Sequence, residues 1–143
     1  MNAARALPHS AEMEKGVLSS MMVGGRDVIA ECAEKISPEH FFLPTHRTIY
    51  TVLVEMWQGD QRIDLITVTE ELRKRNLLGG VGGAWAVTEL QTFVPSEVCV
   101  GYYLDSVCDK YARRGIIAAA TESVRRAYEE QAEVSETLAF AKE

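Results

Sequence analysis

The 143-residue chain has a formal net charge of −6, and 47% of its residues are hydrophobic and 25% charged. This length is typical of one domain with a single hydrophobic core. The acidity disfavours a primary role in binding DNA, because phosphate contacts come mainly from Lys and Arg. We therefore expect little direct DNA binding and mainly protein partners. No run of about 20 apolar residues is present, so no membrane-spanning helix is expected.

The N-terminal part of the chain predicts a disordered segment followed by a short helix. Residues 1–7 are expected to be disordered. Ser10 can cap a helix whose first turn carries Glu12 and Glu14, since acidic residues are favourable at the positive end of a helix. The glycine pair at residues 24–25 is a stop signal for this helix.

Three further elements are expected before residue 60. Residues 27–35 read as a second helix, and Pro38, at the first position after a Ser cap, begins a short turn that delivers Phe41 and Phe42. Pro44 opens the next helix, which Gly59 ends. Its core-facing residues recur at a spacing of three to four: His46, Ile49, Tyr50, Leu53, Met56 and Trp57.

The middle of the chain predicts two more helices around a glycine-rich loop. Asp64 can cap a helix over residues 65–76. The β-branched run at residues 66–69 would also suit a strand, but no second run is present to pair with it. Residues 78–83 form a loop, and residues 84–92 a short helix.

The last third of the chain predicts its longest helix. Ser96 can cap a helix over residues 97–131, and a short helix that restarts near Ser135 can fold back as a helical hairpin. The long helix carries apolar residues on two faces, which leaves open a core helix with a frayed tail or an arm that forms an interface. In the second case the interface residues are Ile117, Ala120, Val124, Tyr128, Leu138 and Phe140.

These elements predict an all-α chain with two parts. About six helices form a globular head over residues 8–95, and residues 96–143 form a helical hairpin. A helix of 35 residues is roughly 50 Å long, whereas a head of this size has a radius of roughly 17 Å. The distal half of the long helix is therefore expected to project from the head.

Residues with a chemical function are not apparent. The glycines at residues 79–83 lack the Gly-Lys-Ser/Thr of a phosphate-binding loop, and His9, His40 and His46 do not share a metal-binding spacing. His46 is expected to make structural hydrogen bonds, and no carboxylate stands in a setting apolar enough to mark a tuned acid. We therefore expect no catalytic residue, metal site or cofactor in this chain.

The number and spacing of the cysteines, together with the N-terminal sequence, predict the cellular compartment of the protein. Cys32, Cys99 and Cys108 form an odd, widely spaced set, which is typical of a reducing compartment rather than of a disulfide framework. The N-terminus has no apolar run of the kind that a signal peptide needs. Both features predict a cytoplasmic protein.

Five short motifs resemble the N-terminal domain of the DnaB family of replicative DNA helicases, in order and in register. They lie at residues 7–14, 41–50, 63–72, 82–90 and 94–103, of which Ile-Asp-Leu-Ile-Thr at 63–67 is the most recognisable. The likeness covers about residues 7–143. It implies a helical head and hairpin that pair into a collar, a trimer of dimers on a hexameric ring.

The resemblance also implies partners. In the family the collar is where primase docks, and it influences contacts with the helicase loader. The ATP- and Mg-dependent motor lies further along the family's chains, so a sequence that stops at Glu143 is expected to be a fragment or a free-standing collar domain. Residues expected at a primase or loader contact are Trp85, Ala86, Arg113, Arg114 and Ile117.

One departure from the family falls in the short helix at residues 84–92. The family places an aromatic residue and Leu before Glu-Leu, whereas this chain has Ala86 and Val87 there, with Trp85 one position earlier. A shift of one residue turns a helical side chain by about 100°. This predicts a divergent member, of the kind carried by a phage or mobile element. The alternatives are the helicase-binding domain of a primase and an unrelated all-α adaptor or regulator.

Overall fold

The computed structural model describes residues 6–93, 100–129 and 133–142, and in these ranges the chain is all-α, as predicted. The elements are α1 (Ala11–Gly24), α2 (Arg26–Lys35), the 3-10 turn η1 (Pro38–His40), α3 (Pro44–Gln58), α4 (Leu65–Lys74), α5 (Gly83–Phe93), α6 (Val100–Tyr128) and α7 (Val134–Lys142). None of the helices in the described residues is long and apolar enough to cross a membrane.

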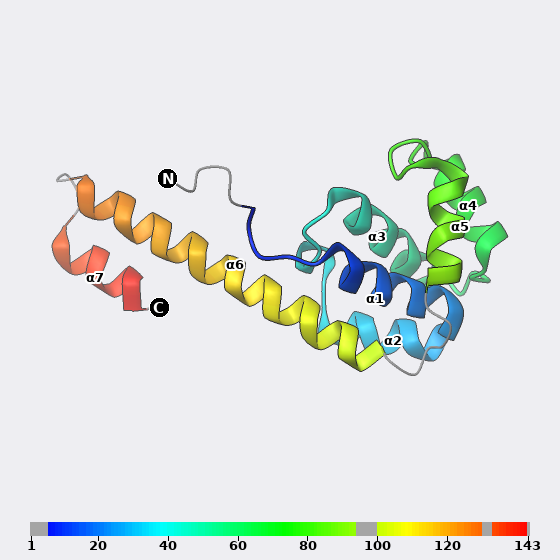
Figure 1. Cartoon of the computed structure of the whole chain (residues 1–143), viewed down its shortest axis with the longest axis horizontal. Coiled ribbons are helices and arrows are strands. Elements are labelled where there is room, and N and C mark those ends of the chain that lie inside the picture. Colours follow the sequence, from blue (N-terminus) through cyan, green and yellow to red (C-terminus); the bar gives the residue numbers. More distant parts are fainter. Residues whose placement is uncertain (1–5, 94–99, 130–132, 143) are drawn as a thin grey trace.

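The head is built around α1, which packs against α2, α3, α5 and the first turns of α6 (Figure 1). Helix α4 completes the head by packing against α3 and α5. The largest fully buried side chains come from most of these elements and include Leu18, Met21, Ile29, Phe41, Leu53, Met56, Leu72, Val87 and Leu104. Burial of these side chains from water is the main force that holds the head together.

Capping residues begin the helices where the sequence predicts. The Ser10 hydroxyl accepts a hydrogen bond from the Met13 amide at 3.2 Å. Asp64 and Thr67 each bond the other's backbone amide, at 2.8 and 2.9 Å, and this capping box fixes the start of α4. The run at residues 66–69 is therefore helical, as expected. Gly25, with a φ of 80°, ends α1 in a conformation that favours glycine.

Helices α1 and α6 cross unusually closely at Gly16. A Cβ atom at this position would lie 2.5–2.7 Å from three ring carbons of Tyr103, so only glycine fits. The same part of α6 buries Val100, Leu104 and Val107 against the head. The first turns of α6 therefore belong to the core of the head, although the predicted hairpin began at residue 96.

The rest of α6 projects from the head, as predicted, and α7 folds back along its far end (Figure 1). We call this projection, α6 from Tyr111 to Tyr128 together with α7, the arm. Helix α6 ends at Tyr128 rather than near residue 131, and α7 begins at Val134. The predicted cap at Ser96 and the predicted disorder of residues 1–5 lie outside the described residues.

Candidate interaction surfaces

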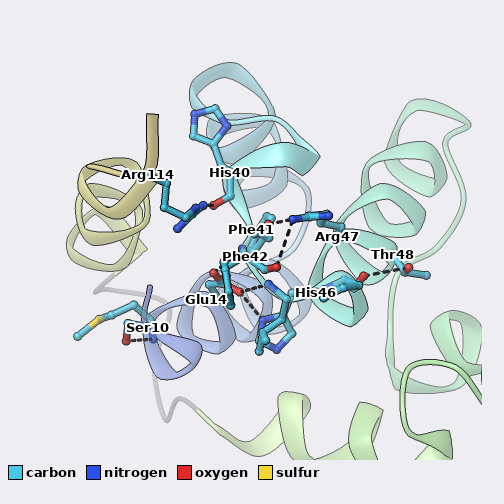
Figure 2. A network of polar contacts seen from close by, with 12 residues as sticks. Ser10, Glu14, His40, Phe41, Phe42, His46, Arg47, Thr48 and Arg114 are labelled. Atoms are coloured by element: carbon cyan, nitrogen blue, oxygen red, sulfur yellow. Dashed lines mark hydrogen bonds and ion pairs between the residues drawn. The ribbon is translucent and has the colours of Figure 1, made fainter. Parts of the chain in front are cut away.

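A buried ion pair joins α1 to α3 inside the head. Glu14 Oε1 lies 2.7 Å from His46 Nδ1, and the side chains of both residues are almost fully buried. Glu14 also accepts hydrogen bonds from the backbone amides of Phe42, at 2.7 Å, and Leu43, at 3.4 Å. The one carboxylate thus holds the turn before α3 against the first turn of α1 (Figure 2).

The hydrogen bonds keep Glu14 ionised. Burial alone would raise the pKa of Glu14, but the bonds from His46, Phe42 and Leu43 outweigh it and hold the pKa below its ordinary value. Glu14 is thus a buried carboxylate, but its lowered pKa is the opposite of what marks a tuned acid. The expectation that His46 makes structural hydrogen bonds is confirmed. The sequence placed Glu14 in a helix's first turn but gave no signal of its distant partners.

Arg114 fastens the base of the arm to two other segments. Its guanidinium donates hydrogen bonds to the backbone oxygens of Pro8 and His40, each at 2.9 Å. The same group lies over the rings of Phe42, at 5.5 Å, and Tyr111, at 5.8 Å. Arg114 is therefore engaged within the chain, and its contact with a partner stays a prediction. Figure 2 shows it directed at His40.

The same cluster holds Pro8 and His9 in the segment before α1. His9 stacks on the Phe42 ring with centroids 4.1 Å apart, and the His40 ring packs at a tilt against Tyr111 at the same centroid distance. The predicted disorder of residues 1–7 stays a prediction. By contrast, Arg113 is exposed and bonds only Asp109, one turn earlier, so its partner contact stays a prediction.

The arm carries an apolar surface that the chain itself does not cover. Among its described residues, the large apolar side chains exposed on it are Tyr111, Ile116, Ile117, Val124, Tyr128, Val134 and Leu138. Tyr128 is 84% exposed, and Leu138, expected to cover α6, is itself 55% exposed. Phe140 is half-buried beneath the Arg126 guanidinium, 4.1 Å from its ring, and Ala120 is exposed. Several large exposed apolar side chains on one projecting part of a chain are typical of a protein interface.

A second candidate surface lies on α5. Trp85 is 73% exposed, so it is not a tryptophan of the core. Ala86 is half-buried, and in the glycine-rich loop before α5 Val81 is buried while Leu78 packs against the core. Gly82 and Gly83 have φ values of 105° and 81°, which favour glycine and hold the sharp turn into α5. Exposed tryptophan is enriched at protein interfaces.

Trp85→Ala is expected to change the free energy of unfolding by less than about 0.5 kcal/mol, because surface substitutions remove few contacts. Leu90→Ala is the matched control in the same helix, since Leu90 is buried and its truncation should cost about 2–5 kcal/mol. Urea unfolding followed by circular dichroism measures both. A loss above about 2 kcal/mol for Trp85→Ala would contradict the exposed position.

Comparison with known proteins finds a family and several relatives. The family model described as "DnaB-like helicase N terminal domain" matches residues 6–109. The replicative DNA helicase DnaB of Leifsonia xyli subsp. xyli is 30% identical over 91% of this chain. The chain spans only 28% of the length of that relative.

Solved structures show the same fold. The crystal structure of the N-terminal domain of DnaB helicase from Mycobacterium tuberculosis is similar with a TM-score of 0.87 and 31% identity, covering 96% of both chains. A DnaB-like replicative helicase, described with its interactions with primase, shares the fold with a TM-score of 0.74. The identity there is 22%, and the match covers 92% of this chain and 30% of that one.

Proposed function

Since the chain belongs to the family of DnaB-like helicase N-terminal domains, we propose that it is the collar domain of a replicative DNA helicase. In this role it joins helicase subunits through the arm and presents the head to primase or a helicase loader. The parent protein would be an ATP-dependent helicase whose ATP and Mg belong to a motor domain outside this chain. Action at the replication fork would place it in the cytoplasm.

The uncovered apolar surface of the arm is the observation that carries the proposal. Tyr128 and Val124 are exposed where α6 has left the head, and α7 covers only part of the helix. A second copy of the arm can cover such a surface, because a two-fold contact uses one self-complementary patch twice. We propose a dimer, which can repeat as a trimer of dimers in a hexamer. Ile117, Ala120, Val124, Tyr128, Leu138 and Phe140 would lie between the arms.

The second surface supports docking of another protein. Trp85 is exposed beside a half-buried Ala86, and Arg113 is exposed on the arm. Primase is the first candidate, because a structural relative is described with its interactions with primase; a loader is the second. The family match favours the helicase over the two alternatives, a helicase-binding domain of primase and an unrelated adaptor.

Replacing Ile117 and Val124 together by Asp is expected to weaken self-association at least tenfold, because the new charges would be buried against apolar side chains. Sedimentation velocity at tens of micromolar should show the unmodified chain at least dimeric and the double variant as a folded monomer. Ile66→Asp is the control, since Ile66 is also an exposed apolar residue but lies on the head. An unmodified chain that stays monomeric at these concentrations would refute arm pairing.

A further inference from the structure

A cluster at the base of the arm joins three segments that lie far apart in the sequence. Arg114 of α6 donates hydrogen bonds to the backbone oxygen of His40 in η1 and to that of Pro8 before α1, each at 2.9 Å. The His40 ring packs against the Tyr111 ring of α6, with centroids 4.1 Å apart. His40 therefore contacts α6 both through its carbonyl and through its ring. We call Arg114, Tyr111, His40 and Pro8 the basal cluster.

One hydrogen bond of the His40 ring shows which of its nitrogens is unprotonated. The backbone N–H of Ser37 donates to Nδ1 of His40 at 3.1 Å. Because a backbone N–H only donates, Nδ1 must accept, so the ring is neutral with its proton on Nε2. The bond belongs to the capping box of η1, in which the third residue reaches back to the capping residue. The conformation of η1, and with it the position of the carbonyl that Arg114 binds, therefore depends on a neutral ring.

A proton on Nδ1 of His40 would act on the basal cluster in two ways. It would remove the acceptor of the Ser37 amide, and it would place a second positive charge beside the Arg114 guanidinium. Burial of the ring lowers the pKa of His40 below its ordinary value, and the charge of Arg114 acts in the same direction. The carboxylate of Glu39, in the same turn, opposes them.

The charged groups that α1 and α3 bring to this region bind the backbone of the residues after His40. Arg47 of α3 donates to the backbone oxygens of residues 41–42, and Glu14 of α1 accepts from the backbone amides of residues 42–43. These bonds do not involve the His40 ring. Protonation of that ring would therefore act mainly on the contact with α6.

We propose that His40 makes the attachment of the arm to the head dependent on pH. With a neutral ring, η1 keeps its capping bond and holds its carbonyl against Arg114. With a protonated ring, η1 loses that bond, the two like charges repel, and α6 is held to the head by its first turns alone. The use of this device rests on the proposed function, because in a collar of paired arms it would change how firmly each head is held.

The direction of the pH dependence follows from the state that the fold favours. The folded chain favours the neutral His40 ring, so the attachment is complete above the ordinary pKa of histidine. It is lost as the pH falls through the lower pKa of the folded state.

Arg114→Ala in two backgrounds tests the proposal by urea unfolding. In the unmodified chain, the loss in the unfolding midpoint at about pH 5.5 should be less than about half of the loss at about pH 7.5, because acid has already weakened the contact. In a His40→Gln background the two losses should be equal. Glutamine accepts from the amide of the capping residue in a capping box but takes up no proton. Glu14 stays ionised at both pH values, because its pKa is lowered from 4.5.

Equal losses at the two pH values in the unmodified chain would overturn the proposal. A loss that becomes smaller in acid in both backgrounds would overturn it as well, because a group other than His40 would then be responsible.

A nuclear magnetic resonance titration of the ¹⁵N-labelled chain gives a second measurement that needs no variant. At neutral pH, Nδ1 of His40 should show the ¹⁵N shift of an unprotonated nitrogen. The Ser37 amide and the Arg114 side chain should then shift together with the His40 ring, with a midpoint below about 6.5. His9→Gln is the matched control and should leave these shifts in place, since His9 and Arg114 both lie against Phe42. A proton on Nδ1 at neutral pH, or a Ser37 amide that does not follow His40, would refute the device.

The arm variant separates this result from the proposed function. Ile117 and Val124 are not part of the basal cluster, so the chain with both replaced by Asp should show the same pH dependence of the Ser37 and Arg114 resonances. Failure of self-association therefore leaves the role of His40 standing. Failure of the pH dependence leaves arm pairing standing.

Discussion

Glu14→Gln is expected to lower the free energy of unfolding at pH 7 by about 3–5 kcal/mol, the usual cost of breaking a buried ion pair from one side. The amide keeps the shape of the carboxylate but cannot accept from His46, Phe42 and Leu43 as an anion does. Glu12→Gln is the matched control, because Glu12 lies in the same helical turn and is exposed. Its effect should stay below about 0.5 kcal/mol. Urea unfolding measures both.

The destabilisation caused by Glu14→Gln is expected to depend on pH. The folded state holds the pKa of Glu14 below its ordinary value, so the carboxylate stabilises the fold above the ordinary glutamate pKa. This stabilisation is lost as the pH falls through the folded-state pKa. The difference in the free energy of unfolding between the unmodified chain and Glu14→Gln should therefore become smaller in acid. A difference that is the same at pH 7 and in acid would show that the ionised form is not what stabilises the head.

Gly16→Ala is expected to lower the free energy of unfolding by about 2–3 kcal/mol, although alanine favours a helix more than glycine does. The added Cβ would lie 2.5–2.7 Å from the Tyr103 ring, so the ring or the two helices must shift. Gly101→Ala is the control, since a Cβ there meets no atom within 4 Å. It should leave stability unchanged or raise it slightly.

The double variant Gly16→Ala with Tyr103→Leu separates the clash from other effects. If the ring is the obstacle, the two changes should together cost less than the sum of the single changes. Additive losses would show that the close approach of α1 and α6 does not cause the destabilisation.

Local signals in the sequence predicted much of the fold. The caps at Ser10 and Asp64 and the proline at the start of α3 mark helix starts in the structure. These predictions succeed because the partner of each capping group lies within one helical turn. The run at residues 66–69 was resolved correctly by the absence of a pairing strand and by the helical residues after it. The family resemblance is confirmed as well.

Contacts between distant segments could not be predicted in the same way. Arg114 bonds Pro8, which lies 106 residues earlier, and Glu14 bonds His46, 32 residues later. Nothing in the local pattern distinguishes these residues from a solvated arginine or from a favourable acid in a first turn. Trp85 was ambiguous for a similar reason, since a large aromatic residue suits both a core and an interface. The role of the arm surface in pairing stays a prediction.

The continuous course of α6 has a mechanical consequence. One helix of 29 residues is both a part of the head's core, through Val107, and the shaft of the arm. The hydrogen bonds from Arg114 to Pro8 and His40 hold α6 at the point where it leaves the head. A torque applied at the tip is therefore transmitted to α1 and the core rather than absorbed by a hinge. If arms are held in pairs, any rearrangement among subunits must pivot at the contacts between arms, and each head turns with its own shaft.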